Sequence, residues 1–417
     1  MKKINAIIVA LLLGMFSAAV AHAAKIESNP LLPDDLKALT GAVELVDRGD
    51  YVAALKVYES LDKKYPRNFL VQYEYMYLRY KMGDYARVVK VGKDLVKSPD
   101  ADPMAYQLYG NALDMSGKTD KARKVYSEGL RRFPSAGSLW LELGNLENIA
   151  GNYTEALRLY NAGVQAQPSF PSNYYQAALL YLSSNQPVWG LVYAETAILL
   201  APDNHGRNRN LAEAMAGCFR DNITVSFEPD NKSAVKITLC PGESMIVPAP
   251  GADGVYVTFP GIYETCMLRG ITEMAFRGEV FLGTIPQLAA LRRAAVEAYF
   301  PTGAEYFGNA MCLPEYQKKI IDAGHWEAYN YFLFYAIDQA DAAAWLADND
   351  GRFSAFLLWL QANPLRLDAD HTVGFNNILA HCSLLDPEGA ARILEKLATQ
   401  PLQSGNQLTS AGATNAE

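Results

Sequence analysis

Residues 49–66 read GDYVAALKVYESLDKKYP, and related stretches follow along the chain. Further copies begin at Gly83, Gly117 and Gly151, and a weaker copy begins at Asn185. Each copy starts 34 residues after the previous one, with nothing inserted or lost. A fixed period of this length is the sequence signature of an array of stacked helical units.

Residues of special backbone geometry or small size recur at fixed places in this period. A glycine opens four copies, where the turn between two helices favours a positive φ. A proline ends the second helix in four copies, at Pro66, Pro134, Pro168 and Pro202. Small residues fall where two antiparallel helices would cross closely, as Ala42 with Ala54, Gly110 with Ala122, Gly144 with Ala156 and Ala178 with Gly190. We therefore expect a mainly α fold with two helices in each period.

This unit resembles the tetratricopeptide repeat family, whose Trp-x-x-Leu-Gly start is matched by Trp140, Leu143 and Gly144. The resemblance covers residues 35–218 and implies an α-solenoid, a superhelix of helical hairpins. The repeats would be 35–68, 69–102, 103–136, 137–170 and 171–204, with a capping helix at 205–218. The second repeat has Met76 and Val88 at the crossing, so we expect a locally wider helix pair there.

The resemblance also implies a concave groove lined by the first helix of each repeat. Its fixed positions place the peptide-binding residues at Tyr73, Tyr77, Tyr80, Gln107, Asn111, Asp114, Asn145, Asn148 and Tyr175. Stacked asparagines bind the backbone of an extended peptide because an amide both donates and accepts. Tyrosines add large, rigid contact area with a polar tip. The other interpretation is that the tyrosines pack between repeats and the asparagines are only solvated.

Residues 1–23 have the layout of a secretory signal peptide. Lys2 and Lys3 precede an apolar run, and Ala21-His22-Ala23 is a small-x-small cleavage signature. We expect cleavage after about Ala23 and a periplasmic or secreted protein; an uncleaved membrane anchor is the alternative. No other stretch is long and apolar enough to span a membrane. The chain carries a net charge of −8, and losing two lysines makes it more acidic, which argues against nucleic acid as a partner.

The second half of the chain changes character. Residues 221–283 alternate apolar and polar residues between Pro and Gly, typical of a β-rich unit of four or five strands. A helical period returns over residues 284–400, with one continuous stretch from His325 to Ala347 and a helix-turn-helix joint near Gly351. Residues 401–417 are small and polar, and we expect them to be disordered.

Five cysteines lie in this half and none form a CxxC motif: Cys218, Cys240, Cys266, Cys312 and Cys382. An exported chain meets oxidising conditions, so one or two disulfides are expected, with a connectivity that the sequence leaves open.

No common catalytic motif is present: the sequence has no HExxH, GxxxxGK, GxSxG or GxGxxG. His371 lies near Asp368 and Asp370, which fits either a metal or acid-base cluster or, more commonly, a loop with a helix cap. We therefore expect no catalytic residue, no metal and no cofactor.

The sequence as a whole favours a non-enzymatic adaptor that binds a protein or extended peptide of the cell envelope through its concave groove. An enzyme or carbohydrate-binding unit in residues 221–400 is the alternative, with the repeats as a docking arm. The aromatic-rich run from Trp326 to Trp359 would support it. A purely architectural, self-associating protein is a third possibility.

Overall fold

The computed structural model describes most of the repeat array and much of the C-terminal half. The described residues are 30–66, 68–184, 187–221, 274–275, 277, 283–300, 311–368 and 370–374, with the backbone of three strands between 224 and 248. The expected signal peptide, the chain beyond residue 374, Cys266 and Cys382 lie outside these residues.

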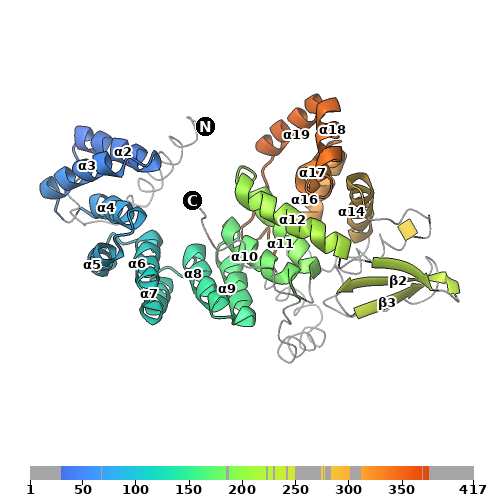
Figure 1. The fold of residues 1–417 in the computed structure, drawn as a ribbon, viewed down its shortest axis with the longest axis horizontal. Coiled ribbons are helices and arrows are strands. Elements are labelled where there is room, and N and C mark those ends of the chain that lie inside the picture. The colour runs from blue at the N-terminus through green and yellow to red at the C-terminus, as the bar shows by residue number, and fades with distance from the viewer. Residues whose placement is uncertain are drawn as a thin grey trace. The chain divides into compact units, whose positions relative to one another are not determined.

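The described part of the chain begins with a series of helical hairpins (Figure 1). The helices are α2 (Pro33–Asp47), α3 (Tyr51–Lys64), α4 (Phe69–Lys81), α5 (Tyr85–Leu95), α6 (Pro103–Met115), α7 (Thr119–Arg132), α8 (Gly137–Ile149), α9 (Tyr153–Ala166), α10 (Pro171–Leu182), α11 (Pro187–Leu200) and α12 (His205–Asp221). The second helices of the five repeats begin at residues 51, 85, 119, 153 and 187, so the sequence period of 34 is also the structural period. The mainly helical fold and the hairpin array are confirmed.

The turns within the hairpins have the geometry that the glycines predict. Gly49, Gly83, Gly117 and Gly151 all have φ between 71° and 79°, a region that other residues enter at a cost. The side chain of Asp50 then accepts a hydrogen bond from the backbone N–H of Ala53 and caps α3. Four of the turns are therefore specified by a glycine at a fixed place in the period.

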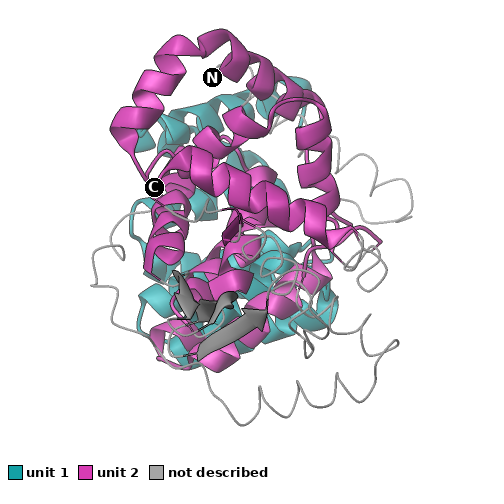
Figure 2. Cartoon of the chain, turned by 90° about the vertical axis from the view of Figure 1, so that its right-hand side faces the viewer, with its two compact units in different colours: residues 1–146 teal, residues 147–417 magenta. Residues whose placement is uncertain are grey.

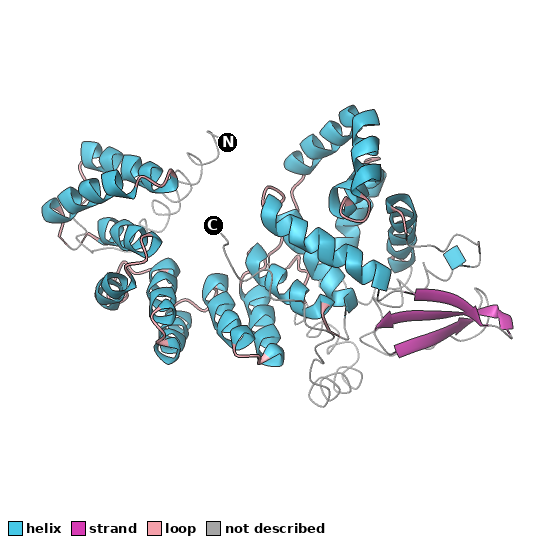
Figure 3. Ribbon diagram, in the orientation of Figure 1, coloured by secondary structure: helices cyan, strands magenta, loops and turns pink. Residues whose placement is uncertain are grey.

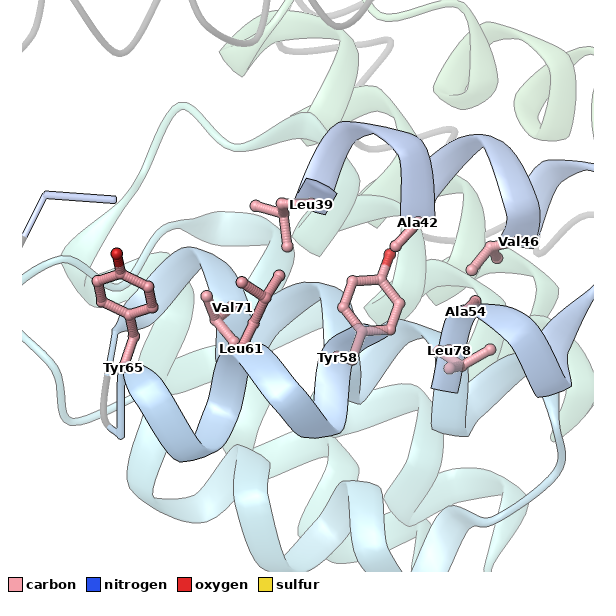
Figure 4. Close-up of a cluster of buried hydrophobic side chains, with 9 residues drawn as sticks. All are labelled: Leu39, Ala42, Val46, Ala54, Tyr58, Leu61, Tyr65, Val71 and Leu78. Carbon is pink, nitrogen blue, oxygen red and sulfur yellow. The ribbon is translucent and has the colours of Figure 1, made fainter. Parts of the chain in front are cut away.

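Small residues allow the close helix crossings that hold each hairpin together. Ala42 and Ala54 are fully buried and lie beside the ring of Tyr58 in the core of the first repeat (Figure 4). A Cβ added to Gly110 would lie 2.1 Å from Cε1 of Tyr126, so only glycine fits there. The predicted small-residue crossings are confirmed at these positions.

The second repeat departs from the pattern, as its sequence suggested. Its second helix, α5, has 11 residues, whereas α3 has 14. Gly92 stands where the other repeats have tyrosine, and the ring of Tyr109 from α6 fills this space, with its Cβ 2.8 Å from where a Cβ on Gly92 would lie. Met76 and Val88 are both buried. The wider helix pair expected here stays a prediction.

The chain forms two compact units, residues 1–146 and 147–417 (Figure 2). The boundary falls inside α8, whereas the sequence suggested an organisational change near residue 218. The physical reason is that the helix after the last repeat, α12, packs against the C-terminal helices. Phe219 of α12 packs edge-to-face against Phe334, with ring centroids 5.6 Å apart.

The C-terminal helices are α14 (Ile285–Tyr299), α16 (Leu313–Asp322), α17 (Trp326–Phe334), α18 (Gln339–Asp348) and α19 (Asp350–Ala362). The stretch from His325 to Ala347, expected as one helix, is two, because Asp338 caps α18 by accepting from the N–H groups of Ala340 and Asp341. The joint expected near Gly351 lies at Asn349, between α18 and α19, and Gly351 itself belongs to α19.

Three strands form an antiparallel sheet in the order β1-β2-β3 (Figure 3). They are β1 (Thr224–Glu228), β2 (Asn231–Cys240) and β3 (Glu243–Pro248). Residues 249–273 lie outside the described residues, so the β-rich unit over 221–283 stays a prediction. Within the described residues, no helix combines the length and the apolar character that crossing a membrane requires.

Candidate functional site

Three of the four tyrosines that the sequence placed in the groove lie on α4, and each of the three is half-buried. Tyr73 stacks on Phe69, with ring centroids 6.3 Å apart. Tyr77 packs against the apolar core of the first repeat. Tyr80 meets Tyr85 edge-to-face at 5.4 Å. Each ring therefore contributes to packing while keeping part of its surface exposed, which combines the two interpretations that the sequence allowed.

The amides of α6 and α8 converge on one carboxylate. Glu142 Oε1 accepts from Gln107 Nε2 at 2.7 Å and from Asn111 Nδ2 at 3.4 Å, and Glu142 Oε2 accepts from Asn145 Nδ2 at 3.2 Å. The buried Tyr126 hydroxyl donates to Asn111 Oδ1 at 2.5 Å. These five residues are called the Glu142 cluster below. Gln107, Asn111 and Asn145 thus lie together around Glu142, a residue outside the predicted set, and their role in peptide binding stays a prediction.

Electrostatics tie Tyr80 to the Glu142 cluster. Burial raises the pKa of Tyr80, and the charges of Tyr85, Glu142 and Asp114 raise it further. Burial likewise raises the pKa of Tyr126, with Glu142 and Asp114 adding to the effect. The carboxylates of Glu142 and Asp114 therefore act on tyrosines of both α4 and α7.

The remaining predicted residues have separate surroundings. Asp114 accepts a hydrogen bond from Thr119 Oγ1 at 2.6 Å, at the joint between α6 and α7. Asn148 is half-buried near the end of α8. Tyr175 belongs to the second unit, where Asn210 Nδ2 lies 3.3 Å from its hydroxyl and the Arg207 guanidinium lies 5.3 Å from its ring centroid. Tyr175 thus contributes to contacts between α10 and α12.

A second glutamate occupies the same place in the period as Glu142. Glu74 of α4 lies two periods earlier, and it is half-buried. Burial raises the pKa of Glu74 to about 7, and the charge of Asp47 adds to this shift. The spacing of two periods was the signal that would have identified both glutamates from the sequence.

The second unit contains a buried ionic network. Glu195 of α11 accepts from Arg292 Nη2 at 2.6 Å and from Gln317 Nε2 at 2.7 Å, and the Tyr329 hydroxyl donates to the same carboxylate. The Arg292 guanidinium also lies 5.0 Å from the Trp326 ring centroid. A small pocket lies beside this network, lined in part by Val192, Phe219 and Tyr299. The opposite charges of Glu195 and Arg292 satisfy each other. The hydrogen bonds to Glu195 join α11 to α14, α16 and α17.

The two features that suggested an enzyme were the aromatic run and the residues around His371. Trp326, Tyr329, Phe334 and Phe356 of the aromatic run are buried, so much of this run forms an apolar interior. His371 and Asp370 are exposed on a turn, where Asp368 Oδ1 accepts from both of their backbone N–H groups. Within the described residues, no group of three or more His, Cys, Asp or Glu is arranged to hold a metal.

Two of the five cysteines have described side chains, and both are buried. Burial raises the pKa of the Cys312 thiol to about 12, which keeps it protonated at neutral pH. The expected disulfides stay a prediction.

Comparison with known proteins bears on the repeats. Residues 110–171 match the family model of the tetratricopeptide repeat, so the resemblance indicated by the sequence is confirmed. No curated protein matches the sequence.

The chain is also similar to solved tetratricopeptide structures. A thermophilic TPR protein of Thermus thermophilus has 22% identity and a TM-score of 0.38, covering 43% of this chain and 98% of that one. MamA of Desulfovibrio magneticus has 14% identity and a TM-score of 0.33, covering 42% and 99%. YrrB, described as a TPR protein with an unusual peptide-binding site, has 14% identity and a TM-score of 0.30, covering 42% and 89%.

Proposed function

We propose that this chain is an exported, non-enzymatic scaffold that binds an extended segment of a partner protein of the cell envelope. The binding surface is the face of the first unit that carries Tyr73, Tyr77, Tyr80 and the Glu142 cluster. The observation that supports this proposal is the meeting of three half-buried amides at the Glu142 carboxylate, with half-buried tyrosines on α4 of the preceding repeat.

This surface has the chemistry that peptide recognition requires. Tetratricopeptide repeats stack into arrays that present extended binding surfaces. The Glu142 carboxylate holds the amides of Gln107, Asn111 and Asn145 in fixed orientations, which lowers the entropy lost when a partner binds. The exposed parts of the Tyr73 and Tyr80 rings supply the aromatic contact area that concentrates binding energy.

Affinity capture after cross-linking in the producing cells tests the binding surface. The comparison uses the wild type, a Tyr73→Ala and Tyr80→Ala double variant, and the control Tyr153→Ala, whose ring is exposed on α9. We expect one discrete partner with the wild type and the control, and its loss with the double variant at unchanged helicity. Equal capture by all three proteins would contradict the proposed surface.

Export is the second part of the proposal, and the layout of residues 1–23 supports it. The intact mass of the protein from a periplasmic or extracellular fraction tests it. We expect a chain that begins near Ala24. A protein that retains Met1 and stays with the cytoplasmic fraction would contradict export without affecting the binding surface.

A further inference from the structure

The first three repeats carry cations at two fixed places of the 34-residue period, seven residues apart. Repeat by repeat, these residues are Lys56 and Lys63, Lys90 and Lys97, and Lys124 and Arg131. Seven residues make two turns of a helix and a rise of about 10 Å, so both cations of α3 lie on one face of that helix, and so do both cations of α7. In the second repeat, α5 ends at Leu95, and Lys97 lies in the turn that follows. These six residues are called the cation rows below.

The cation rows are open to solvent, and most of their charges are not neutralised. All six side chains are exposed. The Nζ of Lys97 lies 3.6 Å from Oδ1 of Asp94, in an exposed pair that contributes little. In the part of the chain that the structure describes, the other five form no ion pair. Like charges repeated along the array repel one another, so the rows favour an anionic binding partner.

The cation rows have the opposite sign to the chain as a whole, which carries a net charge of −8. Helices α3, α5 and α7 together contain eleven basic and five acidic residues, whereas α2, α4 and α6 contain three basic and six acidic residues. In Figure 1, α3, α5 and α7 lie along the outer edge of the first unit. The positive charge therefore gathers on the second helices, and the surface proposed for the partner protein belongs to the first helices.

The cation rows end at the third repeat. At the first of the two places, the fourth repeat has Arg158, which Glu155 neutralises in an ion pair at 2.7 Å, and the fifth repeat has Val192. At the second place, these repeats have Gln165 and Leu199. The repeat fold thus does not require cations at these places, and the unneutralised rows are a property of the first unit.

We propose that the cation rows bind the anionic headgroups of a membrane surface and hold the first unit there through its second helices. Five of the six residues are lysines, whose compact and hydrated charge needs no fixed orientation, unlike the planar fork of arginine. Such lysines suit a fluid layer of headgroups, to which each basic residue near the surface adds attraction. The spacing of about 10 Å within a helix is close to the Debye length at physiological ionic strength, so the fields of neighbouring cations add.

The lysines also favour a lipid surface over an acidic protein. Lysine is depleted in the cores of protein interfaces, which depend on desolvated tyrosine, tryptophan and arginine. The membrane surface goes beyond the proposed function, because it uses other helices and another kind of partner. Bound through α3, α5 and α7, the first unit would keep the face of α4, α6 and α8 free for the partner protein.

Sedimentation with lipid vesicles tests the proposal. Protein purified from the producing cells is mixed with vesicles of phosphatidylcholine alone, or of phosphatidylcholine with phosphatidylglycerol. The wild type is compared with two triple variants in which Lys56, Lys90 and Lys124 become either glutamine or arginine. The matched control loses three exposed lysines outside the rows, through Lys37→Gln, Lys81→Gln and Lys319→Gln. Circular dichroism confirms that all the proteins are folded.

We expect the wild type to bind the vesicles that contain phosphatidylglycerol and to be released at about 1 M salt, where the Debye length is about 3 Å. The glutamine variant should bind about tenfold or more weakly, because each cation near an anionic surface contributes a factor of about five. The arginine variant and the control should bind like the wild type, since both keep the charge of the rows.

Several results would overturn the membrane surface. They are equal binding to both kinds of vesicle, binding that persists at high salt, equal weakening in the control, and no binding to vesicles at all. Binding of polyglutamate or a DNA oligonucleotide in place of vesicles would also overturn it, and would assign the rows to a soluble polyanion. None of these results bears on the partner surface of α4, α6 and α8, which the capture experiment tests separately.

Discussion

At the scale of single residues, the same tyrosine-glutamate pair is used in two ways. In the third and fourth repeats, Asn111 accepts from the Tyr126 hydroxyl and donates to Glu142, which also accepts from Gln107 and Asn145. In the first and second repeats, Tyr58 and Glu74 lack these connections. The backbone period is the same in both places. The earlier repeats have aliphatic or aromatic side chains where the later repeats have the three amides.

Glu142 should stabilise the first unit by holding its neighbours. Glu142→Ala leaves three amide donors without their acceptor, and we expect the free energy of unfolding to fall by about 1–2 kcal/mol. Urea denaturation measures the change, with Glu128→Ala at an exposed position of α7 as the control. If Glu142→Ala lowers the free energy of unfolding no more than Glu128→Ala does, water replaces the carboxylate as the hydrogen-bond acceptor of the amides.

Glu74 should make stability depend on pH. Its folded-state pKa of about 7 lies above the ordinary value of 4.5, so the unfolded chain releases this proton first as the pH rises. The folded protein therefore loses stability through Glu74 as the pH rises above 4.5, and this loss reaches its full size above pH 7. We therefore expect Glu74→Gln to be more stable than the wild type at pH 8, by on the order of 1–2 kcal/mol, and nearly equal at pH 4.5.

Denaturant titrations at the two pH values measure this difference, and Glu44→Gln serves as the matched charge control. A constant difference between Glu74→Gln and the wild type across the range would mean that Glu74 titrates as an ordinary exposed carboxyl.

At the scale of elements, the hairpins depend on close contact at particular glycines. Gly110→Ala places a Cβ 2.1 Å from Cε1 of Tyr126, which forces α6 and α7 apart. We expect a loss of about 1–3 kcal/mol in unfolding free energy, the usual cost of overpacking. Gly41→Ala is the control, because nothing lies within 4 Å of its added Cβ and alanine favours the helix.

The two variants are compared by thermal and urea unfolding. A Gly110→Ala protein as stable as Gly41→Ala would show that the crossing tolerates a methyl group, and that the small residue is not what sets the helix spacing.

Much of the arrangement of helices and turns in the repeats was predictable from the sequence. The period of 34, the turn glycines and the terminal prolines predicted the helices of all five repeats, because local backbone preferences act at each copy. The break between α17 and α18 was not seen, because the apolar period runs on through the capping residue Asp338. The hydrogen bonds between Glu142 and its amides could not be predicted, because the repeat period places each residue on its helix without giving the distances between side chains of neighbouring helices.

At the scale of the whole molecule, the last repeat is joined to the C-terminal helices by a buried charge pair. Glu195 and Arg292 lie 97 residues apart in sequence and form an ion pair at 2.6 Å. No sequence pattern indicated this contact, since it depends on how distant helices pack. It explains why the second compact unit combines repeats with the C-terminal region.

Breaking this pair should destabilise the second unit selectively. Arg292→Met leaves the Glu195 carboxylate buried without its cation, which typically costs about 3–5 kcal/mol. The double variant Arg292→Met and Glu195→Gln should recover part of this loss. Hydrogen exchange measures protection separately in each unit, and an equal loss of protection in residues 30–146 would contradict a selective effect.

We propose that the partner binds the face of α4, α6 and α8 in the first unit. Site-specific photo-cross-linking in the producing cells tests it most directly. A benzophenone amino acid replaces Tyr73 or Tyr80 on this face, or the exposed Tyr153 as the control, and each protein is irradiated and its adducts identified by mass spectrometry. We predict one common partner adduct at Tyr73 and Tyr80 and none at Tyr153. An adduct at Tyr153 with none at the two α4 positions would contradict it.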